Sequence, residues 1–127
     1  MRFMMLVKGN SDYEAGKPPS PALMEAIGAL AERRFRDGTL VEQGGLLPSS
    51  SGALVRVAGG KVSVIDGPFT EARELIGGYA VMDVDSMAEA VALGSEFMAV
   101  HAEVLGPSFE GELEIRAMFE PPPCTSV

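Results

Sequence analysis

The spacing of apolar and polar residues in the first third of the chain predicts a strand, a helix and a second strand. Residues 3–7 are continuously apolar and are followed by Lys8-Gly9-Asn10, which indicates a buried strand. Residues 21–37 carry apolar side chains every three or four positions, the period of an amphipathic helix. Residues 39–47 predict the second strand, interrupted at Gly44-Gly45. The helix also has its expected boundary residues, namely Ser20 as N-cap, Pro21 in the first turn and Gly38 as a left-handed cap.

A β-hairpin is predicted next, over residues 53–65. Two alternating runs flank Gly59-Gly60, which suits a two-residue turn and would pair Ala58 with Lys61. Arg56 and Ser63 then share one side of the hairpin. The same register gathers four valines on the other side, Val55, Val57, Val62 and Val64.

The second half of the chain repeats the order of strand, helix and strand. Residues 78–84 predict a strand, and Ser86 with Glu89 forms a capping box for the helix that follows. Gly106-Pro107 lies beyond the end of this helix, and residues 111–119 alternate as a last strand. The apolar stripe of the helix is predicted to contain Met87, Ala90, Val91, Gly94, Phe97, Met98 and His101.

This order of elements predicts an α+β fold, a ferredoxin-like split β-α-β arrangement with an inserted β-hairpin. Both helices are then expected on one face of the sheet. The first strand is apolar on both faces, so the second face also needs a cover. We expect a homodimer with the two sheets face to face. Residues 1–120 are expected to form a single domain, and residues 121–127 a disordered, proline-rich tail.

Composition limits the class of partner. The chain has 127 residues and a formal net charge of −8, which argues against direct nucleic-acid binding and against an anionic membrane surface. One cysteine cannot close an intramolecular disulfide, and no Cys/His spacing indicates a metal site. The first apolar run reaches Lys8 too early to span a bilayer and precedes no cleavage-site pattern. We expect a cytoplasmic protein without a cofactor.

The segment Asp66-Gly67-Pro68-Phe69 interrupts the apolar pattern between two strands. Its structural interpretation is a tight corner, in which Asp accepts backbone hydrogen bonds and Phe69 fills the core. Its functional interpretation is a carboxylate held at the rim of a pocket. Arg73 and Tyr79 follow closely and are candidates to contact a substrate. The simpler interpretation of Arg73 is a charged residue exposed to solvent. The simpler interpretation of Tyr79 is a residue that packs across neighbouring strands.

The only histidine, His101, lies on the apolar stripe of the second helix. It is either a core residue or a general base, a role that suits neutral imidazole near pH 7. The last strand adds Glu114 and Arg116, on the face opposite Leu113 and Ile115. Both are candidates to contact a substrate, and Arg116 could hold a carboxylate or phosphate group. The simpler explanation for both residues is an ion pair between neighbours or across the dimer.

The stretch DGPFTEARELIGGYAVMDVDSMAEA resembles the motif of the DGPF-type, YCII-related proteins. The N-terminal RFMMLVKGNSDYEAG and the C-terminal FMAVHAEVLGPSFEGELEIRAMFE are similar to the same family, so the resemblance covers about residues 1–120. It implies a dimeric α+β barrel and an active site formed by Asp66 and His101. It also implies an association with extracytoplasmic-function sigma factors. Many members have Lys where this chain has Arg73, which argues against a role that needs a titratable amine.

Three functions follow as hypotheses. The first is a cofactor-independent enzyme acting on a small polar or anionic molecule, in which Asp66 orients His101 and an arginine binds the substrate. The second is a non-catalytic ligand-binding or regulatory protein that uses the same cavity. The third is a structural dimer without a site. The first two differ in what they require of His101, because a general base must titrate near neutral pH and line an open cavity.

Overall fold

The computed structural model of the chain describes residues 1–9, 16–68 and 75–120. The described elements are, in chain order, β1 (Arg2–Lys8), α2 (Pro21–Arg36), β2 (Leu40–Gly45), the 3₁₀ turn η1 (Ser49–Ser51), β3 (Ala53–Ala58), β4 (Lys61–Asp66), β5 (Ile76–Asp83), α3 (Met87–Leu105) and β6 (Leu113–Ala117).

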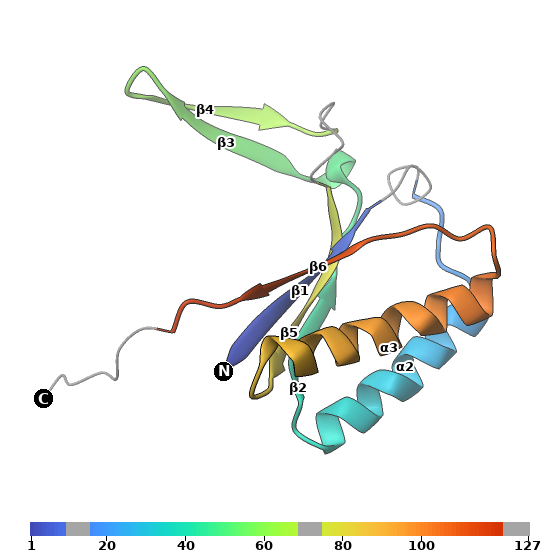
Figure 1. Cartoon of the computed structure of the whole chain (residues 1–127). Helices are drawn as coiled ribbons and strands as arrows, with labels where there is room; N and C mark the ends of the chain where they lie inside the picture. The colour runs from blue at the N-terminus through green and yellow to red at the C-terminus, as the bar shows by residue number, and fades with distance from the viewer. Residues whose placement is uncertain (10–15, 69–74, 121–127) are drawn as a thin grey trace, which may run out of the picture.

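Four of the strands form one antiparallel sheet in the order β2-β5-β1-β6. Both helices lie on the same side of this sheet (Figure 1). In this order β5 lies between β1 and β2, and β6 pairs with the other edge of β1. Two β-α-β halves arranged in this way give the observed order. The structure therefore confirms the ferredoxin-like α+β fold.

Strand β1 lies in the middle of the sheet, and its alternation separates two different faces. Phe3 and Met5 point toward the helices and are buried, at 1% and 4% exposed. Met4 and Leu6 lie on the opposite face, which no helix covers, and they are half-buried. We call this second surface the helix-free face. Most of the core thus lies on the helix side of the sheet, whereas Val81, opposite Met4, is buried on the helix-free face at 6% exposed.

Both helices begin at the predicted caps. The Ser20 hydroxyl accepts a hydrogen bond from the Leu23 amide at 3.1 Å, and the Ser86 hydroxyl accepts one from the Glu89 amide at 3.2 Å. The carboxylate of Glu89 accepts from the amide of Asp85 rather than from that of Ser86. The chain leaves α2 through Gly38 at a φ of 83°, the left-handed geometry that glycine favours.

The buried side of α3 is narrower than its apolar pattern suggested. Ala90, Gly94 and His101 are buried, whereas Met87 and Val91 are 43% and 46% exposed. A Cβ at Gly94 would lie 2.9 Å from Ile115 Cδ1, so the missing side chain lets α3 approach β6 closely. No helix in the described part of the chain is long and apolar enough to cross a membrane.

Strands β3 and β4 form a separate two-stranded sheet that extends away from the helices (Figure 1). We call this hairpin, Ala53–Asp66, the arm. Its register is the predicted one, with Ala58 opposite Lys61 and Arg56 opposite Ser63. Gly59 and Gly60 have φ angles of 57° and 75°, as a two-residue turn of this hand requires. Every residue of the arm is exposed to solvent.

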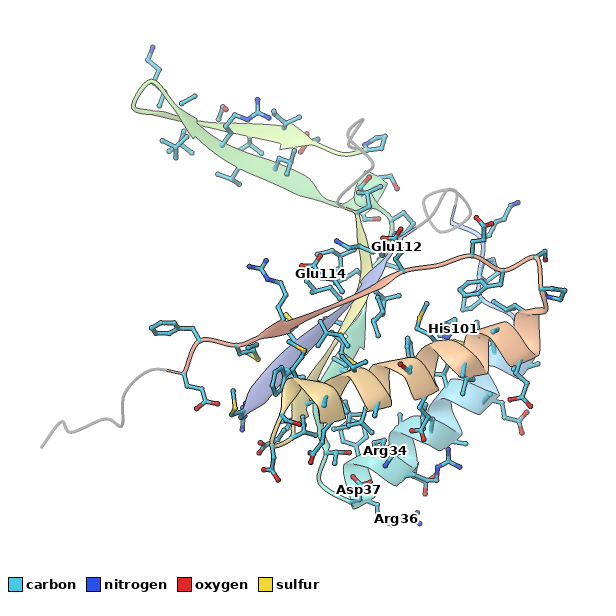
Figure 2. The ribbon with its side chains drawn as sticks, viewed as in Figure 1. Arg34, Arg36, Asp37, His101, Glu112 and Glu114 are labelled. Carbon is cyan, nitrogen blue, oxygen red and sulfur yellow. The ribbon has the colours of Figure 1, made fainter. Side chains whose placement is uncertain are left out.

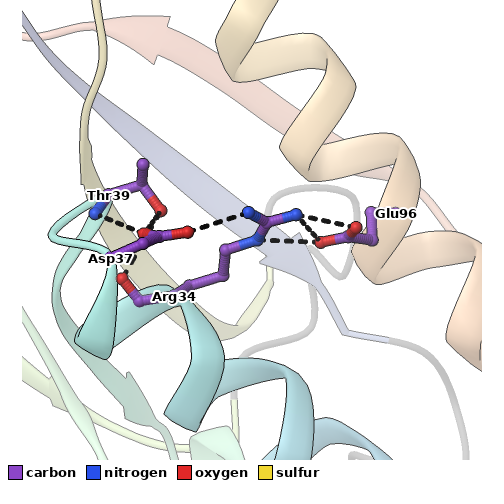
Figure 3. A network of polar contacts seen from close by, with 4 residues as sticks. All are labelled: Arg34, Asp37, Thr39 and Glu96. Atoms are coloured by element: carbon purple, nitrogen blue, oxygen red, sulfur yellow. Dashed lines mark hydrogen bonds and ion pairs between the residues drawn. The ribbon is translucent and has the colours of Figure 1, made fainter.

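An ionic network joins the two helices and the start of β2 (Figure 3). Arg34 donates from Nε and Nη2 to Glu96 on α3, at distances between 2.6 and 2.9 Å. Its Nη1 donates to Asp37 at 3.0 Å. The other Asp37 oxygen accepts from the hydroxyl and the amide of Thr39, and these bonds, with Arg34, lower the pKa of Asp37. Arg34 therefore fixes the position of α3 against the end of α2.

Candidate functional site

An open cleft of about 1210 Å³ lies between the helices and the sheet. The sheet contributes residues from the helix-facing side of β1 and β5, and the helices contribute apolar and aromatic side chains. Polar residues from the connecting segments, such as Lys17 and Glu110, also line it. The principal lining residues for its chemistry are Met5, Val7, Met82, Phe97, His101 and Phe109.

His101 is the titratable group in the wall of this cleft that is most buried, at 9% exposed (Figure 2). Its Nδ1 lies 2.9 Å from the carbonyl oxygen of Phe97, one turn earlier on α3. A carbonyl can only accept, so Nδ1 carries the proton and Nε2 of the neutral ring carries the lone pair. The Phe97 ring meets the imidazole edge-on at 4.6 Å, and Phe109 stacks on it at 5.5 Å.

Nε2 of His101 has no hydrogen-bond partner among the described residues. A buried polar atom of this kind ordinarily has a partner, and leaving it without one costs about 1–3 kcal/mol. The Phe97 carbonyl of the same helix orients the ring, so no carboxylate is needed for this purpose. Nε2 of His101 can therefore accept a hydrogen bond or a proton from a molecule in the cleft.

Asp66 lies at the end of β4, at the base of the arm, and is exposed. No hydrogen bond or ion pair joins it to His101, both residues being described. Their pairing in an active site thus stays a prediction. The corner after Asp66 has a clear structural role, because the Gly67 amide donates to the Gly52 carbonyl at 2.9 Å.

Gly67→Ala is expected to open this corner. A Cβ at Gly67 would lie 1.7 Å from the backbone oxygen of Ser49, so the segment must move away from η1 and lose its hydrogen bond to Gly52. Faster amide hydrogen exchange in residues 49–68, with unchanged exchange in β1, would show the effect. The matched control is Gly45→Ala, where nothing lies within 4 Å of the added atom. Equal exchange in both variants would contradict the expectation.

Glu114 and Arg116 lie on the helix-free face, opposite Leu6 and Met4 of β1. Glu114 accepts from Lys8 Nζ at 2.9 Å, and this hydrogen bond, with the charge of Lys8 and a smaller contribution from Arg116, lowers the pKa of the Glu114 carboxyl. Arg116 Nε lies 3.7 Å from Glu114 and is largely exposed. The sheet therefore separates these two residues from the His101 ring, which lies on the helix side.

Tyr79 also presents its side chain on the helix-free face. Its hydroxyl donates to Glu42 Oε1 on the neighbouring strand at 3.0 Å, and this bond to a carboxylate raises the pKa of the phenol. The Tyr79 ring covers Gly44, where a Cβ would lie 2.8 Å from Cε1. Tyr79 is therefore a cross-strand packing residue whose hydroxyl already has a partner.

Arg73 and Phe69 lie outside the described residues. Within residues 1–9, 16–68 and 75–120, no group of three or more His, Cys, Asp or Glu side chains is placed to hold a metal ion. The candidate residues therefore fall at separate places. His101 lines the cleft, Asp66 lies at the base of the arm, and Glu114 and Arg116 lie on the helix-free face. Tyr79 also lines the cleft, although its hydroxyl is bonded to Glu42.

Sequence reasoning missed two residues that shape the cleft. Phe109 follows the end of α3 and returns to stack on His101, a contact that helical periodicity does not predict. Arg34 comes four residues after Leu30, at the spacing of the apolar side chains of α2. A charged residue at such a position is a usable signal for a partner on a facing helix. Glu96 is that partner.

Comparison with known proteins places residues 1–105 on the family model of the YCII-related domain. The chain is also similar to an uncharacterised protein of Rhizobium meliloti (strain 1021), with 29% identity over 75 residues. That match covers 59% of this chain and 60% of the relative's length.

Proposed function

We propose, for a chain that belongs to the YCII-related family, that the cleft between the helices and the sheet binds a small organic molecule and that His101 recognises it. The observation that carries the proposal is the imidazole of His101, a residue that is nine-tenths buried in the wall of the cleft and whose Nε2 has no hydrogen-bond partner among the described residues. A ligand with an O–H or N–H donor would supply the missing hydrogen bond.

The lining of the cleft narrows the class of ligand. Phe97 and Phe109 pack around the imidazole and keep one side of it apolar. Polar groups such as Lys17 and Glu110 lie on the segments that connect the elements. A ligand with an apolar body, one donor directed at His101 and a polar end fits this distribution, as in most small-molecule sites.

Two activities are compatible with such a ligand. In the first, His101 removes a proton from the bound molecule, as a neutral imidazole with a fixed tautomer can do. In the second, the protein binds the molecule without reaction and acts as a regulatory accessory protein. The second is favoured by one feature, since no described carboxylate bonds to His101 to stabilise its charged form.

Phenol is a suitable first probe, and toluene is its matched control because it lacks only the hydroxyl. His101→Phe is expected to weaken phenol binding about tenfold, the loss of one hydrogen bond, and to leave toluene binding unchanged. Because His101 is the only histidine, its imidazole ¹⁵N resonances report the complex without ambiguity. Phenol should shift the Nε2 signal in the unmodified protein, whereas toluene should not.

The helix-free face provides the control variant. Arg116→Gln alters a charged group on that face, outside the lining of the cleft, and is expected to leave phenol binding unchanged. Phenol that shifts no imidazole signal, or that binds equally well to His101→Phe, would sink the proposal. For a compound that binds, hydrogen–deuterium exchange at its C–H positions then separates the two activities. Exchange that depends on His101 indicates an acid/base enzyme, and its absence indicates a binding protein.

A further inference from the structure

The helix-facing side of the sheet is filled at one end and open at the other. Phe3, Met82 and Leu40 lie side by side on β1, β5 and β2, and they are 1%, 4% and 7% exposed. Val7 lies farther along β1 on the same face, yet it is only half-buried and lines the cleft. The helices therefore leave this second end of the sheet uncovered toward the cleft.

Two glycines continue the open end across the sheet. Gly78 lies opposite Val7, and Gly45 lies opposite Gly78, so this row crosses β1, β5 and β2. Residues directly opposite each other on antiparallel strands share a face, so a side chain at either glycine would point toward the helices. Both glycines line the cleft, and we call them the glycine floor. The sheet presents bare backbone to the cleft there.

The two glycines differ in the space around them. A Cβ at Gly78 would lie 3.0 Å from the backbone oxygen of Gly44, so the close approach of the two strands accounts for this glycine. A Cβ at Gly45 would meet nothing within 4 Å, and its φ is not positive. Neither packing nor backbone geometry requires glycine at position 45. The space that its missing side chain leaves belongs to the cleft.

His101 lies toward the same end of the cleft. Helix α3 runs along β1, because Ala90 packs with Phe3 near the filled end of the sheet. Farther along the helix, a Cβ at Gly94 would lie 3.6 Å from the methyl group of Met5. His101 follows about two helical turns later (Figure 2). A nine-tenths buried acceptor without a described partner and an uncovered stretch of backbone therefore line one cleft.

We propose that this cleft takes a planar ligand of two fused rings that carries a hydroxyl group. One ring reaches His101 with the hydroxyl, and the other ring lies flat on the glycine floor. This inference rests on the proposed function, because it takes the hydrogen bond to Nε2 of His101 as given. It adds the class of ligand and a residue, Gly45, that determines which ligands fit.

The shape of the floor favours a flat ring over a bulky aliphatic skeleton. Neighbouring strands lie about 4.8 Å apart, so the two glycines together offer bare backbone about as wide as a six-membered ring. A planar ring contacts such a surface with its whole face, whereas a rounded skeleton touches it with few atoms. The Phe97 and Phe109 rings around the imidazole suit the other ring of the same ligand.

The test compares 2-naphthol with phenol, which has the same hydroxyl and one ring fewer. In the unmodified chain, 2-naphthol is expected to bind at least about tenfold more tightly, since its second ring buries further apolar area. Gly45→Val places a side chain over the floor, and a β-branched residue suits a strand and has little rotational freedom. It is expected to weaken 2-naphthol binding at least about tenfold, by excluding the second ring.

Phenol binding is expected to stay within about twofold in Gly45→Val, because phenol does not reach the floor. Gly28→Val is the matched control variant. Gly28 is exposed on α2 outside the lining of the cleft, and a Cβ there also meets nothing within 4 Å. The control is expected to leave the affinities for both compounds unchanged.

NMR of the unmodified chain keeps the test decisive if Gly45→Val misfolds. A ring lying on the floor is expected to shift the amide resonances of Gly45 and Gly78, and phenol is expected to leave them in place. The imidazole ¹⁵N signals of His101 are followed in the same titrations. If neither compound shifts them, the proposed function fails and this inference fails with it.

Other outcomes overturn this inference alone. Phenol shifts the imidazole signals in each of these cases, so the proposed function stands. The first is a Gly45→Val variant in which the affinities for phenol and 2-naphthol change alike or not at all. The second is an equal effect of Gly28→Val on 2-naphthol binding. The third is a complex with 2-naphthol in which the amides of Gly45 and Gly78 do not shift.

Discussion

Phe3→Ala is expected to lower the free energy of unfolding by about 3–5 kcal/mol, the usual cost of removing a buried phenylalanine ring. Phe3 is 1% exposed and is the only large side chain in the described part of the chain that is fully buried. It lies on the central strand β1 and packs with Val84 and Ala90, with Leu93 and Ile115 around them. Chemical denaturation followed by circular dichroism measures the change.

The control for Phe3 is Leu47→Ala, a substitution of an apolar residue that is 77% exposed. It is expected to change the free energy of unfolding by less than about 0.5 kcal/mol. A similar loss in both variants would contradict the placement of the core on the helix side of β1. Phe3 does not line the cleft, so phenol affinity of the folded Phe3→Ala fraction should match that of the unmodified chain.

Arg34→Met is expected to cost about 1–2 kcal/mol of stability, more than an ordinary surface ion pair. The guanidinium makes three bonds to Glu96 and one to Asp37, and methionine keeps most of the apolar stem. The bonds to the two carboxylates also raise the pKa of Arg34, with Glu96 as the larger cause. The expected loss stays below that of a buried pair because Arg34 and Glu96 are 28% and 38% exposed.

Arg36→Met, two residues along the same helix, is the matched control. Arg36 pairs with Glu32 at 2.6 Å, but the two side chains are 73% and 69% exposed. Its removal is expected to cost no more than about 0.5 kcal/mol, the value for an exposed i,i+4 pair. Equal thermal and chemical stability of the two variants would show that Arg34 does not hold α3 against α2.

The local elements of this protein were predictable because their signals lie within a few residues. Ser20 and Ser86 accept amide hydrogen bonds from residues three positions later. Each cap and the first turn of its helix can therefore be recognised within a stretch of four residues. The arm is the clearest case. A two-glycine turn permits one register, and that register decides which side chains share a face. The order of strands followed from these elements because few topologies accommodate two β-α-β halves.

The candidate site was less predictable, since its parts come from distant segments of the chain. Alternation along β6 indicated the face of Glu114, but the bond to Lys8 depends on the pairing of β6 with β1. Periodicity along α3 indicated that His101 faces inward. It did not indicate that Phe109 returns to cover the ring or that Nε2 is left without a described partner.

The sequence alone therefore determined the helices, the strands, the register of the arm and the two faces of β1, because each depends on backbone propensity and on periodicities of two or 3.6 residues. Only the tertiary structure decided that Gly67 packs against Ser49, that Arg34 binds Glu96, and that the sheet lies between Arg116 and His101. These contacts join residues that are tens of positions apart. Their geometry depends on how whole elements pack, which no local pattern encodes.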